Sequence, residues 1–198
     1  MAINQRNKVL LIVLGVLVIL SIYIGVTYNR LVRQDENVKL NWGNLQNSYQ
    51  RRLDLTPSLV AVVKASSDYE KQTLEQLANA RSRASQITAN TTAADYNNYN
   101  NQEKAQADVA NSINRVIALI ERYPDLKSTK SYLYLQSQLE GTERRIKTSR
   151  NDFNQSVAEF NKLVRGFPSN IAASFFGYKP KEGFQSNGGS ENAPEVKF

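Results

Sequence analysis

The residues VLLIVLGVLVILSIYIGVTY, from Val9 to Tyr28, form an uncharged apolar run, and no other stretch of the chain is as long and apolar. About 20 such residues are what an α-helix needs to cross a ~30 Å hydrocarbon core. A cleaved signal peptide has a shorter apolar region followed by small residues, whereas Ile22, Ile24 and Val26 continue this run. A buried core helix is the other alternative, but such helices rarely stay apolar over this length. We therefore expect an uncleaved signal anchor that crosses a membrane once.

The charges on either side of the run do not settle its orientation. Arg6 and Lys8 precede it, and Arg30, Arg33 and Lys39 follow it. Membrane topology follows the side that carries more Lys and Arg, and here the two sides are nearly equal. Both orientations of the domain after the run therefore remain open.

The chain has 198 residues, with no cysteine and no histidine. The first absence excludes disulfides, thiol nucleophiles and cysteine metal sites, and the second removes the usual general base and the commonest metal ligand. Most familiar catalytic constellations need one of the two residue types, although a lysine or carboxylate mechanism stays open. We expect a protein that is not an enzyme, without catalytic, cofactor-binding or metal-ligating residues.

The net charge of +7 has three interpretations. It reflects solvated helix faces, attraction to anionic lipid headgroups beside the anchor, or nucleic-acid binding. The last needs interleaved aromatic residues or a recognisable module, which the basic cluster of Arg144, Arg145, Lys147 and Arg150 lacks. We expect that cluster to be a solvated face, and we expect membrane lipid, rather than nucleic acid, as a partner.

Helical periodicity covers most of the rest of the chain, over about residues 29–87, 95–121 and 128–165. Apolar residues recur every 3.5 positions from Leu31 to Ile87, which implies left-handed packing against another helix. Pro57 interrupts this repeat, and it either kinks one long helix or begins a new one after a reversal. The repeat keeps its phase across Pro57, which favours the kink.

These patterns predict an all-α protein in which an N-terminal transmembrane helix is followed by an elongated antiparallel bundle of long, coiled-coil-like helices. The expected boundaries are a short segment at 1–8, the span at 9–28, the bundle at 29–176 and an extended or disordered tail at 177–198. Gly, Pro, Ser and Asn dominate that tail, a composition typical of disorder. Docking of the tail onto the bundle or onto a partner is the alternative.

The lengths of the predicted helices suggest an interaction surface. A helix over 29–87 would be close to 90 Å long at ~1.5 Å per residue, and the second helix is about half as long. The membrane-proximal part of the first helix would then lack an intrachain partner. Its apolar seam would be exposed for self-association or for another membrane protein, unless the chain reverses at Pro57. The seam residues are Leu31, Val38, Trp42, Leu45 and Tyr49.

Charged residues on or near the seams predict a buried polar network. Arg52 and Glu70 fall on the seam of the first helix, where each needs a partner if buried. An arginine can clamp a carboxylate from another helix and fix the register of the two, although arginines that lie along the bundle with their charges in water remain the alternative. The predicted network comprises Arg52, Asp54, Glu70, Glu143 and Arg145.

Three stretches carry a resemblance to a known family, in a fixed order along the chain. They are YNRLVRQDENVKLNWGNLQNSYQRRLDLTPSLVAVVK at 28–64, EKQTLEQLANARSRA at 70–84 and LEGTERRIKTSRNDFNQSVAEFNKLVRGFPSNIAASFFGYKPKEGF at 139–184. With Trp42, Pro57 and Arg81 among their marks, they resemble the LemA family of bacterial membrane proteins. Leu53 and Thr56 stand where that family more often has alanine and isoleucine.

The resemblance implies a single-pass protein of the bacterial cytoplasmic (inner) membrane with a helical-bundle domain, and it brings no catalytic site with it. Genes of the family often neighbour those of membrane metalloproteases or small phosphatase-like domain proteins, which implies such proteins as possible partners. We expect a membrane-anchored scaffold or adaptor that assembles with itself, as a homo-oligomer, or with other envelope proteins. The alternative is an envelope sensor that binds a ligand and signals through the membrane-proximal helix.

Overall fold

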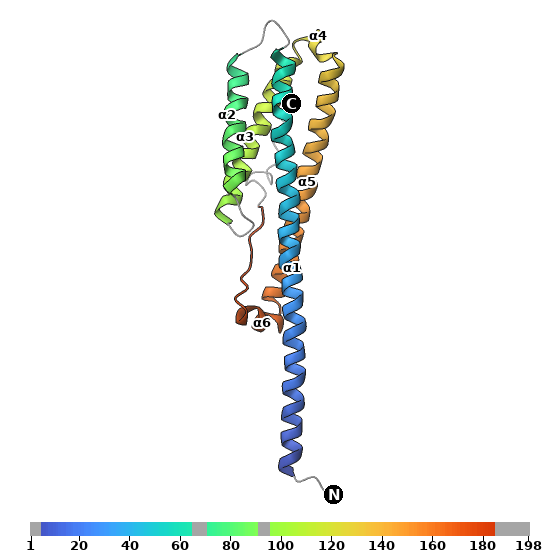
Figure 1. Ribbon diagram of the computed structural model, residues 1–198, viewed down its shortest axis with the longest axis vertical. Coiled ribbons are helices and arrows are strands. Elements are labelled where there is room, and N and C mark those ends of the chain that lie inside the picture. The colour runs from blue at the N-terminus through green and yellow to red at the C-terminus, as the bar shows by residue number, and fades with distance from the viewer. Residues whose placement is uncertain (1–4, 65–70, 91–95, 185–198) are drawn as a thin grey trace, which may run out of the picture. The chain divides into compact units, whose positions relative to one another are not determined.

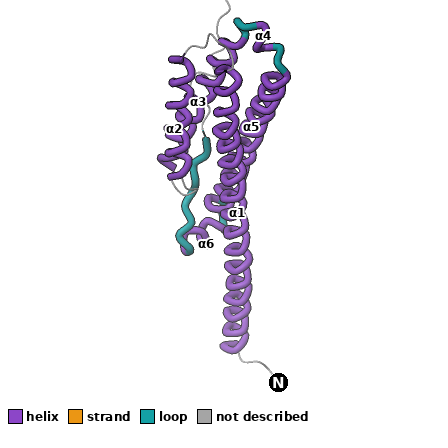
Figure 2. Tube along the Cα trace, turned by 45° about the horizontal axis from the view of Figure 1, so that its top comes forward, coloured by secondary structure: helices purple, strands orange, loops and turns teal. Residues whose placement is uncertain are grey.

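The structure is a computed structural model that describes residues 5–64, 71–90 and 96–184. Over these residues all regular structure is helical, so the predicted all-α class is confirmed (Figures 1 and 2). The helices are α1 (Gln5–Lys64), α2 (Lys71–Asn90), α3 (Tyr96–Ile120), α4 (Pro124–Lys127), α5 (Lys130–Arg165) and α6 (Ser169–Phe175).

The chain divides into two compact units, and both α1 and α5 contribute to each of them. The first unit comprises Met1–Lys39 and Gln155–Lys181, and the second comprises Leu40–Asn154 and Glu182–Phe198, as far as these ranges are described. Each unit has its own buried core.

The prediction of one helix over 29–87 is wrong. α1 ends at Lys64 and α2 begins at Lys71, while Pro57 lies inside α1. Proline has no amide to donate to the carbonyl four residues earlier, which here belongs to Leu53. That carbonyl instead accepts a hydrogen bond of 2.9 Å from the Arg81 Nε of α2. The acceptor that Pro57 leaves free thus positions a second helix beside α1.

The second unit is a four-helix bundle of the later part of α1, α2, α3 and the earlier part of α5 (Figure 1). α2 and α3 form an antiparallel hairpin whose apolar residues recur three and four positions apart, as amphipathic helices require. The core of the second unit contains, among others, Leu53, Leu59, Leu77, Ala84, Val109, Ile113, Val116, Tyr132 and Leu139.

The first unit combines the earlier part of α1 with the end of α5, α6 and the segment that follows α6. Its buried residues include Leu31, Phe160 and Ala173, each 0% exposed. Gly177 ends α6 in the left-handed region at φ 75°, which glycine adopts without steric cost. The chain then continues without regular structure to Phe184, and the rest of the predicted tail, 185–198, lies outside the described residues.

The apolar run at the start of α1 is long and apolar enough to cross a membrane. Its large apolar side chains from Val9 to Ile22 are each at least 53% exposed. The described chain therefore does not bury this run as a core helix.

Candidate functional site

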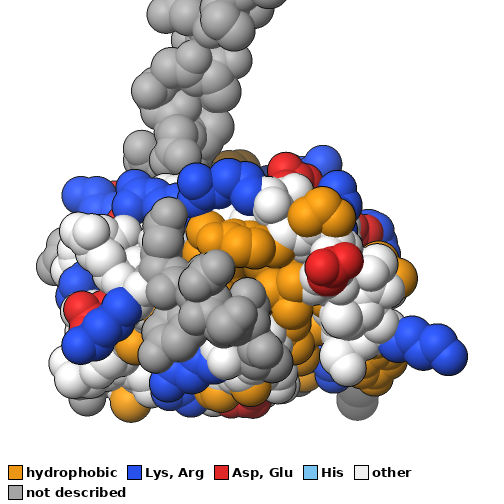
Figure 3. All heavy atoms as spheres, turned by 90° about the horizontal axis from the view of Figure 1, so that it is seen from above, with side chains coloured by type: hydrophobic (Ala, Val, Ile, Leu, Met, Phe, Trp, Pro, Cys, Tyr) orange, Lys and Arg blue, Asp and Glu red, His pale blue; other side chains and the backbone are white. Residues whose placement is uncertain are grey.

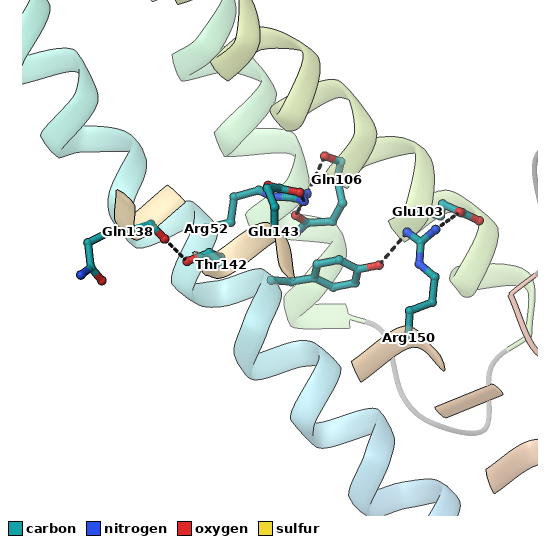
Figure 4. Close-up of polar contacts among 8 residues, drawn as sticks. Arg52, Glu103, Gln106, Gln138, Thr142, Glu143 and Arg150 are labelled. Atoms are coloured by element: carbon teal, nitrogen blue, oxygen red, sulfur yellow. Dashed lines mark hydrogen bonds and ion pairs between the residues drawn. The ribbon is translucent and has the colours of Figure 1, made fainter. Parts of the chain in front are cut away.

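The polar centre of the second unit is built around Arg52 of α1, which is only 4% exposed. Its Nε and Nη2 donate to the two carboxylate oxygens of Glu143 on α5, at 2.8 and 2.6 Å (Figure 4). Its Nη1 donates to the backbone carbonyl and the side-chain oxygen of Gln106 on α3, at 3.0 and 3.2 Å. A planar guanidinium is suited to such bidentate pairing. One side chain thus links three helices in a fixed register.

Arg150 of α5 forms a second polar link, although the sequence predicts it on a solvated face. It is partly buried, and it donates to Glu103 of α3 at 2.8 Å and to the Tyr49 hydroxyl of α1 at 3.4 Å (Figure 4). Burial raises the pKa of the Tyr49 phenol. Burial acts to lower the pKa of Arg150, but Tyr49 and Glu103 outweigh it and the pKa is raised. Arg150 therefore carries its charge as a structural group, because both partners favour the cation.

A cluster of four aromatic rings lies against Arg150 through Phe184. The rings of Trp42, Tyr99, Phe153 and Phe184 lie with centroids 4.5 to 6.1 Å apart. The guanidinium carbon of Arg150 lies 5.2 Å from the centroid of the Phe184 ring, within the range of a cation–π contact. The cluster joins α1, α3 and α5 to the segment after α6.

An asparagine of α5 holds Phe184 in that cluster. The Asn154 amide donates to the Phe184 carbonyl at 3.0 Å, and its oxygen accepts from the Phe184 amide at 2.9 Å. The amide of one asparagine thus supplies both the acceptor and the donor that the backbone of Phe184 needs. The sequence predicts docking of the tail only as an alternative, because no pattern in it identifies Asn154 as the anchor.

The first unit repeats this arrangement one heptad later on α5. Asn161 donates to the Lys181 carbonyl at 2.7 Å and accepts from the Lys181 amide at 2.8 Å. The Lys181 ammonium pairs with Asp35 of α1 at 3.0 Å, and Lys39 pairs with the same carboxylate at 3.1 Å. Burial acts to raise the pKa of Asp35, but the hydrogen bonds from Lys181 and Lys39 outweigh it, so the pKa lies below its ordinary value.

The predicted interaction seam is not an exposed surface. Leu31, Val38, Leu45 and Tyr49 are 0% exposed, and Trp42 is 5% exposed. The error comes from the predicted length of the first helix. The real α1 ends at Lys64, and α5 runs far enough to supply packing partners for α1 in both units.

Only part of the predicted polar network is brought together. Arg52 and Glu143 form the ion pair described above, whereas Asp54 is exposed and accepts a hydrogen bond from Gln50 of its own helix at 2.8 Å. Arg145 is also exposed. Glu70 lies outside the described residues. Gln106 is not predicted from the sequence, because a glutamine on a helix face usually faces solvent and the acceptor role of its backbone carbonyl leaves no sequence signal.

The described residues contain no group of three or more acidic side chains placed to hold a metal ion. The polar hollows of the second unit lie on its surface. One of about 500 Å³ is lined by Asn44, Asn47, Ser48, Gln50, Arg51, Asp54, Arg145 and Ser149, most of them exposed. The buried polar groups described above connect helices, whereas this hollow is lined mainly by exposed side chains.

Over the described residues, these features define an all-α bundle protein that has one helix long and apolar enough to cross a membrane and buried polar links between its helices. The chain belongs to the LemA family, because the LemA family model matches residues 41–198.

The chain is also similar to individual proteins. It is 24% identical to Protein LemA of Metamycoplasma hominis over 83% of this chain and 71% of that protein. It is 32% identical to Magnetosome protein MamQ 2 of Paramagnetospirillum magneticum over 41% of this chain, and 31% identical to Magnetosome protein MamQ of Magnetospirillum gryphiswaldense over 40%. The matches span only 30% and 29% of the length of those two magnetosome proteins.

Proposed function

We propose that this protein is a membrane-anchored, non-enzymatic scaffold of the bacterial inner membrane that assembles with itself or with other envelope proteins. The observation that supports the proposal most strongly is that the buried arginines bind groups on other helices of the same chain. Arg52 and Arg150 each bridge α1, α3 and α5, so the charged groups of the interior stabilise the arrangement of the helices. Other molecules would then bind the outer surface of the second unit.

The surface of the second unit suits protein contacts. Seen from the end that carries α4, apolar side chains lie at the surface among Lys and Arg side chains (Figure 3). Near this end Leu133 and Tyr134 of α5 are 53% and 69% exposed. Exposed aromatic and aliphatic groups with a polar rim are typical of protein interfaces. The proposal therefore places the partner contacts on exposed helix faces instead of the buried seam.

The ligand-sensor alternative requires a polar pocket inside the bundle. The hollows beside α2 and α3 are lined mainly by exposed side chains, such as Arg83, Lys104 and Asp108. This lining favours the scaffold over the sensor.

Site-specific crosslinking in native membranes tests the proposal. The chain has no cysteine, so each introduced cysteine is its only thiol and the unaltered chain is the matched control. We choose one exposed position on each long helix of the second unit, namely Asn47→Cys, Arg83→Cys, Lys104→Cys and Arg145→Cys. With a thiol-to-amine crosslinker, we expect at least one helix face to give a discrete product at native expression levels.

The same product should be absent from the cysteine-free chain, and it should form with both a short and a long crosslinker. A set of four variants that all remain monomeric, while staying folded and membrane-bound, would contradict the scaffold.

A further inference from the structure

The segment around α6 presents a stripe of exposed apolar side chains. Phe167, Ile171 and Phe175 are 84%, 64% and 82% exposed. Ile171 and Phe175 lie four residues apart on α6 and so share one face of the helix, and Phe167 lies two residues before the first residue of α6, Ser169. Ala172 and Ala173 pack into the first unit, while the stripe does not. Large apolar groups are seldom gathered at a water-exposed surface in this way.

The stripe lies beside the apolar part of α1. A hollow of about 510 Å³ separates α6 from the run, within the first unit, and it is lined almost wholly by apolar groups. From α1 it is lined by Val16, Ile19, Leu20, Tyr23 and Ile24, and from the α6 segment by Pro168, Ile171, Ala172 and Phe175.

We propose that α6 is a second membrane contact, which inserts its Phe167–Ile171–Phe175 stripe into the bilayer beside the span and leaves the hollow to lipid acyl chains. This inference rests on the proposed anchoring of the protein by α1. It makes the membrane attachment a span plus a monotopic helix.

The position of the hollow gives the expected depth. At ~1.5 Å per residue, Ile24 and Val16 lie roughly 6 and 18 Å along α1 from Tyr28. Tyr28 ends the apolar run, where aromatic residues favour the membrane interface. A hydrocarbon core of ~30 Å has leaflets of about half that thickness. The hollow therefore begins inside the leaflet that faces the rest of the chain and reaches just past the bilayer midplane, and the α6 stripe beside it falls mainly within that leaflet.

The backbone of the segment is suited to lipid, where an unpaired polar group is costly. The amides of Asn170, Phe176 and Tyr178 donate to carbonyls of the same segment at 2.7, 3.0 and 2.9 Å. The Ser169 hydroxyl donates to the carbonyls of Leu163 and Gly166 at 2.6 and 2.9 Å. The segment thus satisfies much of its own polar backbone without water.

The polar and basic residues around the segment suit an interfacial helix. Asn170 and Ser174 are exposed on a neighbouring face of α6, where they would meet headgroups while the apolar face enters the acyl region. Exposed basic residues of the same unit follow the apolar run of α1 and flank α6 along the chain, namely Arg30, Arg33, Lys162, Arg165 and Lys179. Such residues attract anionic lipid. The bilayer is the occupant that this combination favours, because the stripe continues the apolar surface of a membrane span.

Depth measurements in liposomes test the inference with the full chain. Phe175→Cys and, separately, Ile171→Cys would carry the only thiol, labelled with an environment-sensitive fluorophore, in vesicles of phosphatidylcholine and phosphatidylglycerol. Both side chains are exposed, so their replacement leaves the core intact. Glu75→Cys, at a side chain of α2 that is 61% exposed, is the water-facing control in the second unit, and Leu17→Cys is the control within the span.

We expect the labels at Phe175 and Ile171 to behave like the label at Leu17. Their emission should shift to the blue, nitroxide groups on the acyl chains should quench them, and aqueous iodide should not. The unlabelled thiols should also react at least ~10-fold more slowly with a water-soluble maleimide than the thiol introduced at Glu75, because the reactive thiolate is disfavoured in lipid.

Three outcomes would overturn the inference. Quenching by iodide at both positions, with Leu17 quenched by the lipid nitroxides, would place α6 in water while the anchor stands. Protection from both quenchers would show that a protein, either a second copy or another membrane protein, covers the stripe. A Leu17 label that lipid nitroxides fail to quench would contradict the anchoring proposal itself.

Discussion

Removal of the charge at Arg52 should destabilise the second unit far more than removal of a surface charge. The guanidinium side chain is 5% exposed and the Glu143 carboxylate side chain is 49% exposed. Breaking a fully buried ion pair costs about 3–5 kcal/mol, and water that reaches the half-exposed Glu143 reduces that figure. We therefore expect Glu143→Gln to cost about 2–3 kcal/mol, since it leaves the buried Arg52 cation without its counter-charge.

Arg52→Met keeps the apolar volume but removes all four hydrogen bonds of the guanidinium, so two acceptors of Gln106 lose their donor. An unpaired buried polar group costs about 1–3 kcal/mol, which again gives a loss of about 2–3 kcal/mol for this variant. The double variant Arg52→Met/Glu143→Gln should be less destabilised than the sum of the two, with a coupling energy of about 1.5 kcal/mol or more.

Trp42 provides the assay, because it is the only tryptophan of the chain and is buried in the second unit. Its fluorescence during thermal and urea unfolding in detergent micelles gives the free energy of unfolding for each variant. A loss of 2–3 kcal/mol corresponds to a Tm lower by roughly 5–10 °C for a chain of this size. The exposed pair Lys71 and Glu75, with side chains 82% and 61% exposed, is the control, with an expected coupling of about 0.5 kcal/mol or less.

A coupling energy for Arg52 and Glu143 no larger than that of the control pair would refute the reasoning. It would mean that the ion pair contributes no more than a solvated surface contact.

Three further predictions concern other links. Arg81→Met should lower the free energy of unfolding by about 1–2 kcal/mol, because it removes the donor to the Leu53 carbonyl. The loss should be smaller when Pro57→Ala supplies a backbone amide to that carbonyl. Equal losses in both backgrounds, measured by Trp42 fluorescence, would disprove the link. Phe184→Ala should cost about 3 kcal/mol or more and shift the Trp42 emission to the red, whereas an unchanged spectrum would show that the ring does not shield Trp42. The pKa of Asp35 is lowered in the folded chain, so the ionised carboxylate stabilises the first unit by about 1 kcal/mol. This stabilisation should be complete above about pH 4, the ordinary range of the carboxyl, and should be lost as the pH falls through the folded pKa. Hydrogen-exchange protection of residues 177–181 should therefore drop at low pH in the wild type and change less in Asp35→Asn.

The all-α class and the presence of the span follow from hydrophobic periodicity and length alone, because both depend on local patterns. The extent of the first helix does not follow, since the seam keeps its phase through Ala80 and Ala84, which belong to α2. A repeat of apolar residues does not reveal whether two successive segments form one helix or pack antiparallel.

The polar links divide in the same way. Arg52 stands out because a charge on an apolar seam requires a partner, and Glu143 is a carboxylate on the facing helix. Asn154 and Asn161 do not stand out, because they hold the backbone of a distant segment, and backbone groups are the same at every position. Tertiary contacts of this kind leave no trace in composition or periodicity.

The mass of the assembly in native membrane patches tests the scaffold most directly. The chain alone has a mass of 22.3 kDa. With the protein at its native level and extracted together with its surrounding lipid, native mass spectrometry should find it mainly in complexes of two or more polypeptides. A population that consists only of the single 22.3 kDa chain with bound lipid would contradict the proposed function.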